Sequence, residues 1–263
     1  MFNVIFAELR KLRRPSLFLG TMSAVVFFSA LFSSLLFLLI DSPQGNSDRG
    51  RTIGREVLSL STGGVQGFAS VGTFLGIIAL CVFAAQTAQE YTYSTLGNLL
   101  IRQPNRWLIL SGKLTAMSIF ATVMAIFSAI VSIGASVILA PRAKIPTDLW
   151  FGTDGRHAIL QTFVNVLISV IGFGSVGMIL GLILRSPISA ISFGVLWLLI
   201  VENLVIAVKN NTENWMPGAQ LAAIAQGGTP NVSYSHALFL GGMYVLAGSI
   251  ISSVLFARRD VSN

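Results

Sequence analysis

The chain has 263 residues, of which 54% are apolar and only 10% are charged. Soluble domains carry about 25% charged residues, so the composition excludes an ordinary soluble fold and indicates an integral membrane protein. The net charge of +7 gives no reason to expect nucleic-acid binding, because the basic residues flank apolar segments and form no patch interleaved with aromatic side chains.

Six segments are apolar over about 20 residues, the length of a helix that crosses a bilayer. The first follows a basic stretch but is longer than the apolar region of a signal peptide, about 7–15 residues, so we expect it to remain as a span. The sequence therefore predicts an all-α integral membrane fold with one transmembrane domain over residues 1–263. The expected spans cover residues 16–40, 65–85, 114–140, 158–184, 188–208 and 237–256.

The basic residues predict the orientation of these spans. An even number of spans places both termini on one side, and the whole net charge of +7 falls on that side, whereas basic and acidic residues balance on the other. The positive-inside rule assigns the basic side to the cytoplasm. We therefore expect a multi-pass protein of the plasma (inner) membrane, in a bacterium, with both termini cytoplasmic.

Residues 1–15 predict an amphipathic helix ahead of the first span. Phe2 and Phe6 lie on its apolar face, whereas Glu8 and Lys11 lie largely on the polar face. A helix of this kind lies in the membrane interface and forms an elbow into the first span. The alternative is that this segment is only a basic stop for that span.

Residues 86–113 form a polar segment between the second and third expected spans. Glu90 opens a run with leucines at helical spacing, and Pro104 ends it, which predicts a short surface helix. The other internal cytoplasmic connection, residues 185–187, is very short. Residues 86–113 are therefore the main place where another protein inside the cell can hold this one.

Two loops on the expected outer side carry structural signals. Pro217 starts a short helical pattern that Gly227 and Gly228 end. We expect this helix to re-enter the membrane, with its backbone shielded by a dimer interface. In the preceding outer loop, Trp150 and Phe151 predict an aromatic pair at the membrane interface.

Glycines within the spans match a nucleotide-binding pattern only by coincidence. Gly172, Gly174 and Gly177 satisfy G-x-G-x-x-G, but they lie inside an apolar span with no preceding strand. Small residues at helical spacing instead let helix backbones approach closely. We expect helix packing at Gly72, Gly76, Gly174, Gly177 and Gly181.

The chain offers no group of residues for catalysis. Ser111, Gly112 and Lys113 resemble the end of a phosphate-binding loop, but the first glycine and the final serine or threonine of that motif are missing. The two histidines are not at metal-ligand spacing, and the spans offer one acid. We therefore expect no enzyme activity and no catalytic, cofactor-binding or metal-binding residue in this chain.

That acid, Glu202, lies beside Asn203 in the fifth expected span. A charge at the centre of a membrane helix costs about 2.5–3.5 kcal/mol on insertion scales, so such a residue usually faces protein or water. One hypothesis is that Glu202 and Asn203 line a translocation path or hold a break in the helix near an outer gate. The alternative is an acid close enough to the outer interface to be solvated.

The elbow, the six spans, the polar segment after the second span and the short helix before the sixth resemble the permease subunits of type-2 ABC exporters. Such permeases often show an acid, a Gly-Thr-Leu-Arg-like turn, two leucines, a proline, an arginine and a lysine leading into the third span. Ser94 and Gly97 depart from that pattern. The matching residues are Glu90, Thr95, Leu96, Leu99, Leu100, Pro104, Arg106 and Lys113.

The resemblance implies a coupling helix seated on a separate ATPase subunit, which binds ATP and Mg, within an exporter of two permeases and two ATPases. The second permease is either the same chain or a different one. Permeases of similar size export antimicrobial peptides or drugs and serve antibiotic resistance, which implies an amphipathic or hydrophobic substrate. The residues implied to contact the ATPase are Glu90, Thr95, Leu96, Leu99, Leu100, Arg102 and Arg106.

Two other classes stay open on the sequence. A secondary transporter or channel is the first, although coupling ions generally need polar groups near the bilayer centre and often inverted repeats. A non-transporting membrane immunity or scaffold protein is the second. A neighbouring gene for an ATPase would distinguish the three classes.

Overall fold

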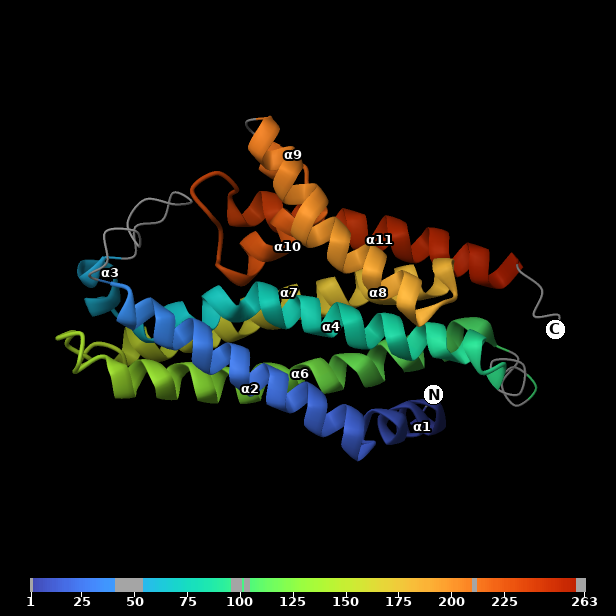
Figure 1. Ribbon diagram of the computed structural model, residues 1–263, viewed down its shortest axis with the longest axis horizontal. Coiled ribbons are helices and arrows are strands. Elements are labelled where there is room, and N and C mark those ends of the chain that lie inside the picture. The colour runs from blue at the N-terminus through green and yellow to red at the C-terminus, as the bar shows by residue number, and fades with distance from the viewer. Residues whose placement is uncertain (1, 41–53, 96–100, 102–104, 210–211, 259–263) are drawn as a thin grey trace.

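The computed structural model describes residues 2–40, 54–95, 101, 105–209 and 212–258. Over these residues the chain is helical and contains no strand, which confirms the predicted all-α class (Figure 1). The elements are α1 (Phe2–Leu12), α2 (Pro15–Leu38), α3 (Arg55–Ser59), η1 (Gly63–Val65), α4 (Gln66–Thr92), α6 (Arg106–Leu139), α7 (Thr153–Leu184), α8 (Pro187–Leu196), η2 (Trp197–Val201), α9 (Glu202–Val208), η3 (Thr212–Asn214), α10 (Pro217–Ala225) and α11 (Tyr234–Arg258).

Six helical segments in the described part of the chain are long and apolar enough to cross a membrane. They are α2, η1 with α4, α6, α7, the continuous run α8–η2–α9, and α11 as far as Phe256. Each overlaps one of the predicted apolar windows over most of its length, although the windows 16–40 and 114–140 extend one or two residues beyond the observed helices. The protein is therefore a multi-pass membrane protein with the predicted number of spans.

The helices that flank the polar segment are longer than hydropathy predicts. The second helix, α4, continues to Thr92, and α6 begins at Arg106, so only residues 93–105 separate the two. Hydropathy ends a span where polar residues begin, but Gln86, Thr87 and Glu90 are buried against neighbouring helices. Because these polar side chains face protein, the helix continues through them.

Both ends of the described chain lie at the same end of the bundle, on the right in Figure 1. We call it the terminal end: it holds α1, the last turns of α4 and α11, and the first turn of α6. The opposite end, called the distal end, holds α3 and the α6–α7 connection, and α9 and α10 lie at the top of the same view (Figure 1). The helices of the bundle run between these two ends.

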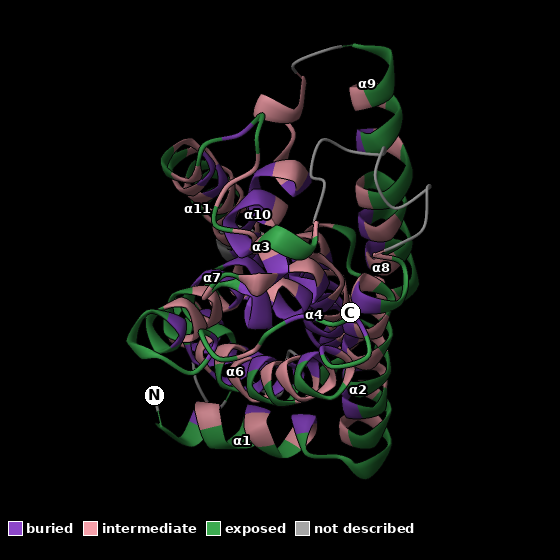
Figure 2. Ribbon diagram, turned by 90° about the vertical axis from the view of Figure 1, so that its left-hand side faces the viewer, coloured by how far each residue is buried: buried purple, intermediate pink, exposed green. Residues whose placement is uncertain are grey.

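The core lies along the contact between α4 and α7, where buried residues are concentrated (Figure 2). Glycines let the two helices approach: a Cβ atom on Gly177 would lie 2.2 Å from the backbone oxygen of Leu80, and one on Gly76 would lie 2.1 Å from the Phe173 ring. Gly174 and Gly181 lie against the same helix pair, and Gly72 lies where α4 meets α7 and α10.

Helix α1 packs Glu8 against the bundle and leaves its phenylalanines exposed. Val4, Glu8 and Leu12 are buried, whereas Phe2 is 77% and Phe6 is 67% exposed. The polar face that the sequence predicts therefore contributes Glu8 to a contact within the protein, which the amphipathic pattern alone does not indicate. Phe2 and Phe6 remain available to the surroundings of the bundle.

Helix α10 is present where the sequence predicts it, from Pro217 to Ala225. It ends at Gly227 and Gly228, which adopt positive φ angles of 70° and 103° that favour glycine. The sequence led us to expect that a dimer interface shields the backbone of this helix. In the structure, α10 packs against α4, α7 and α11 of the same chain, so these helices already shield it. The apolar side chain of Leu221 is buried there.

At the distal end, Trp150 closes a small apolar cluster that includes Phe37 and Leu58. Its indole nitrogen donates a hydrogen bond of 2.9 Å to the carbonyl oxygen of Leu58. The predicted interfacial pair is therefore wrong for Trp150, which is buried, while Phe151 is exposed. The loop folds back onto α3, and this long-range contact has no local signal in the sequence.

Candidate functional site

Four charged side chains from three helices meet at the terminal end, and we call them the four-charge cluster: Glu8, Lys11, Glu90 and Lys113. The ammonium nitrogen of Lys113 lies 2.8 Å from Oε1 of Glu90 and 3.0 Å from Oε2 of Glu8. The ammonium nitrogen of Lys11 lies 2.7 Å from Oε1 of Glu8 and 2.7 Å from Oε1 of Glu90. Each lysine therefore bridges both acids.

The cluster is buried and neutral overall. Lys113 is 1%, Glu8 is 3% and Glu90 is 7% exposed. Moving isolated charges out of water is costly, and only close pairing with complementary hydrogen bonds offsets that cost. Burial lowers the pKa of Lys11, but the negative charges of Glu90 and Glu8 outweigh burial and raise this pKa above its ordinary value. The two acids therefore hold the ammonium group of Lys11 in its charged form.

Close backbone contact brings α1 onto α6. A Cβ atom on Gly112 would lie 2.8 Å from Cγ1 of Val4, so the glycine beside Lys113 is what permits this approach. Leu12 is buried one turn beyond Glu8. These apolar contacts lie beside the buried members of the cluster, where a low local dielectric strengthens the ion pairs.

Other contacts tie the remaining helices together at the terminal end. The guanidinium of Arg106 at the start of α6 donates to the carbonyl oxygen of Phe256 in α11 and lies 5.5 Å from the centre of its ring. The guanidinium of Arg185, after α7, lies 5.4 Å from the centre of the Tyr91 ring in α4. Both contacts place a cation over an aromatic face. Residues 93–105 therefore join two helices whose ends are fixed to α1, α7 and α11.

The residues implied to contact an ATPase are spread over different environments. Glu90 is buried in the four-charge cluster, where its carboxylate contacts Lys11 and Lys113. Thr95 is exposed, and Arg106 is held against Phe256. The other expected contacts, Leu96, Leu99, Leu100 and Arg102, lie outside the described residues.

Sequence reasoning missed the partners of Glu90. Lys11 and Lys113 are 79 and 23 residues away from it, and Glu8 is 105 residues from Lys113. The one local signal is the spacing of Glu8 and Lys11, which puts an acid and a base on neighbouring turns of a helix. An acid on the otherwise basic N-terminal segment is the clue that this helix has a partner.

Away from this cluster, Glu202 is 3% exposed and directly follows a π-helical stretch of the fifth span. The five residues before it form a π-helix, Trp197–Val201, a feature that is frequent at functional sites. Oε1 of Glu202 accepts hydrogen bonds of 2.9 Å from Nε1 of Trp197 and 2.9 Å from the backbone nitrogen of Gly218. Oε2 accepts one of 3.1 Å from the backbone nitrogen of Ala219.

These contacts make Glu202 the cap of α10. Gly218 and Ala219 belong to the first turn of α10, where backbone N–H groups lack partners within the helix and the helix dipole favours a negative charge. The amide nitrogen of Asn203 also contacts this stretch, because it donates to the carbonyl oxygens of Leu198 and Leu199 in the π-helix.

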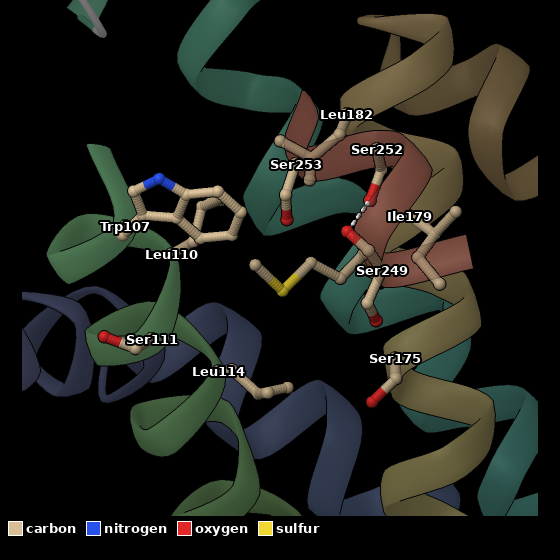
Figure 3. A pocket seen from close by; sticks show the side chains of 11 residues that line it. Trp107, Leu110, Ser111, Leu114, Ser175, Ile179, Leu182, Ser249, Ser252 and Ser253 are labelled. Carbon is tan, nitrogen blue, oxygen red and sulfur yellow. Dashed lines mark hydrogen bonds between the residues drawn. The ribbon is translucent and has the colours of Figure 1, made fainter. Parts of the chain in front are cut away.

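A separate cavity of about 180 Å³ lies at the terminal end between α6, α7 and α11 (Figure 3). Serines from all three helices line it, with Trp107 on one side. The hydroxyls of Ser111, Ser175 and Ser252 donate to carbonyl oxygens of their own helices. No charged residue lines this cavity.

No group of three or more His, Cys, Asp or Glu side chains among the described residues is arranged to hold a metal ion. The four-charge cluster satisfies its two carboxylates with two ammonium groups. Its chemistry is therefore that of a structural tie between helices.

Comparison with known proteins gives the family of the chain. No curated protein matches the sequence. Residues 55–262 match the model of a family described as "Protein of unknown function (DUF2705)", and this match covers Glu202, α10 and the polar segment after α4. The chain is therefore a multi-pass membrane protein that belongs to the DUF2705 family.

Proposed function

We propose that the chain is the membrane-spanning permease subunit of an ATP-driven exporter of the type-2 ABC kind, powered by a separate ATPase subunit. One observation carries the proposal: the four-charge cluster fixes α1 to both helices that flank residues 93–105. A partner that grips residues 93–105 would therefore move α1, α4 and α6 together.

The energetics favour this transmission of force. Separating α1 from α4 and α6 would break the two ion pairs that join them, Lys11 with Glu90 and Lys113 with Glu8, in a buried site where close pairing offsets the cost of removing the charges from water. A push on residues 93–105 therefore moves the helices as a unit, because bending at the cluster is costly. A flexible loop on unconnected helices would absorb the same push.

The proposed orientation follows the distribution of charge, with the terminal end in the cytoplasm of a bacterial plasma membrane. The ATPase partner then binds ATP and Mg and contacts residues 93–105, and a second permease, identical or different, completes the translocation path. The apolar character of the spans favours an amphipathic or hydrophobic substrate, such as an antimicrobial peptide or a drug.

The proposal is tested by co-expressing the chain with an ATPase encoded beside it and purifying the complex through a tag on the permease. We expect the two proteins to purify together, and we expect Leu99→Asp with Leu100→Asp to abolish this association. The matched control is Leu60→Asp with Leu149→Asp, which places the same charges at exposed positions of the distal end. That variant should keep the ATPase.

Two outcomes contradict the proposal. One is retention of the ATPase by the Leu99→Asp, Leu100→Asp variant. The other is transport by the purified chain in vesicles without an ATPase, driven by an ion gradient, which would indicate a secondary transporter.

A further inference from the structure

Two cavities lie on opposite sides of Glu202. One, of about 270 Å³, is lined by apolar side chains of α7 and α8 and by Trp197 of η2. The other, of about 340 Å³, lies between α4, α7, α9 and α10 and has a mixed lining; we call it the mixed cavity. Phe173, Leu198, Glu202 and Gly218 line both cavities. The acid is therefore in the wall that separates them.

Within the described part of the chain, the carboxylate of Glu202 has no cationic partner. Its three hydrogen bonds come from one indole and two backbone N–H groups, and no Lys, Arg or His of the described residues lies within ion-pair distance of it. All three partners donate, so they satisfy the ionised form of the acid. Dipoles alone offset this buried negative charge, whereas the four-charge cluster matches each acid with ammonium groups.

Two polar residues that line the mixed cavity, Ser70 and Asn203, favour a ligand that donates hydrogen bonds. The hydroxyl of Ser70 donates to the carbonyl oxygen of Gln66 at 2.8 Å, and the amide nitrogen of Asn203 donates to two backbone carbonyls. The O–H group of Ser70 and the N–H groups of Asn203 are therefore already used in hydrogen bonds. The oxygen atoms of these side chains can still accept hydrogen bonds from a ligand. Phe74 and Ile77 supply an apolar wall to the same cavity.

We propose that the mixed cavity binds the ammonium group of an amphipathic organic cation, with Glu202 as its counter-ion. The apolar body of the ligand packs against Phe74, Ile77 and Phe173. This inference rests on the proposed function, because it names the class of substrate that the exporter would carry. Binding of the cation itself requires no ATPase. A positive charge placed beside the carboxylate in a site of low dielectric is strongly favoured, and an anion of the same shape is excluded.

The experiment uses the full chain, purified and reconstituted in nanodiscs of zwitterionic lipid, and three probes with one skeleton. These are 4-phenylbutylammonium, the neutral 4-phenylbutanol and the anionic 5-phenylpentanoate. Isothermal titration calorimetry should show saturable binding of the ammonium compound, with affinity at least tenfold above that of the alcohol, and no binding of the carboxylate. Equal binding of the ammonium compound and the alcohol overturns the proposal.

Variants locate the site. Glu202→Gln should lower the affinity for the ammonium compound at least tenfold, whereas Glu213→Gln, the same change at an acid that lines neither cavity, should leave it unchanged. Ala222→Leu fills the mixed cavity without altering Glu202 and should also weaken binding, so the proposal can be tested even if Glu202→Gln fails to fold. Full affinity in Ala222→Leu, or in a folded Glu202→Gln, overturns it.

The two proposals fail separately. Loss of ATPase association with intact ammonium binding would contradict the exporter and leave the cation site standing. Intact ATPase association without ammonium binding would contradict the cation site and leave the exporter standing.

Discussion

The two buried acidic sites of this protein solve the same physical problem in different ways. At the terminal end, Glu8 and Glu90 are neutralised by Lys11 and Lys113, and the result is a tie between helices. Near α10, Glu202 accepts hydrogen bonds from three N–H groups and has no cationic partner among the described residues. The comparison teaches that a buried acid paired with cations serves to hold helices together. A buried acid that only N–H groups solvate can still accept a cationic ligand.

The largest effect should follow from Lys113→Met. This change removes the buried one of the two lysines that contact both acids. Glu8 and Glu90 then lie buried beside one another, with Lys11 as their remaining cation in the cluster. Breaking a buried ion pair costs about 3–5 kcal/mol, so the free energy of unfolding should fall by that amount, measured by denaturant titration in mixed micelles. Arg10→Met, at an exposed position of α1, is the control and should change it by less than about 0.5 kcal/mol. A loss of similar size in both variants would show that the cluster is not a tie.

A second strong effect should follow from Gly177→Ala. The added Cβ atom would lie 2.2 Å from the backbone oxygen of Leu80, which forces α4 and α7 apart. Overpacking of this kind costs about 1–3 kcal/mol. The matched control is Gly134→Ala, where nothing lies within 4 Å of the new atom, and stability should stay equal or rise. Equal stability of the two variants in thermal unfolding would contradict the tight contact between α4 and α7.

Glu202→Gln should have a smaller effect on stability. The amide keeps the size of the side chain and can still accept a hydrogen bond, but it loses the charge that favours the first turn of α10. We expect a loss of about 1 kcal/mol in the same denaturant titration. A loss as large as that of Lys113→Met would remove the contrast between the two acidic sites.

The smallest effect concerns pH and Lys11. Because the pKa of Lys11 is raised in the folded state, its contribution to stability is complete below its unfolded pKa of about 10.4 and is lost as pH rises through the higher folded value. The difference in unfolding temperature between wild type and Lys11→Met should therefore be constant at neutral pH and shrink above about pH 10.4. A difference that grows at alkaline pH would have the wrong sign for this cluster.

The spans could be read from the sequence because hydropathy over about 20 residues depends only on neighbours along the chain. Helix α10 was readable for the same reason, through Pro217 and the glycine pair. The four-charge cluster was not, because its members come from α1, α4 and α6 and only the packed bundle brings them together. The same limit applies to Trp150, whose partner Leu58 is 92 residues away.

Glu202 lies between these two cases. Its position inside a span signalled a residue with a partner, since an unsatisfied charge there is costly. The identity of that partner, the first turn of α10, depends on the π-helix at Trp197–Val201, and no residue in that apolar run predicts it.

The π-helix also sets the direction in which the whole second half of the fifth span faces. One additional residue in a helical turn rotates everything that follows by about 100°. Trp197 and Glu202, five positions apart, are thereby brought onto one side, where the indole and the acid meet. Deletion of a single residue between them would restore regular α-helix and turn Glu202 away from α10 without changing its chemistry. The phase of one helix, rather than the presence of an acid, therefore decides whether this protein has a negative charge in the wall between two cavities.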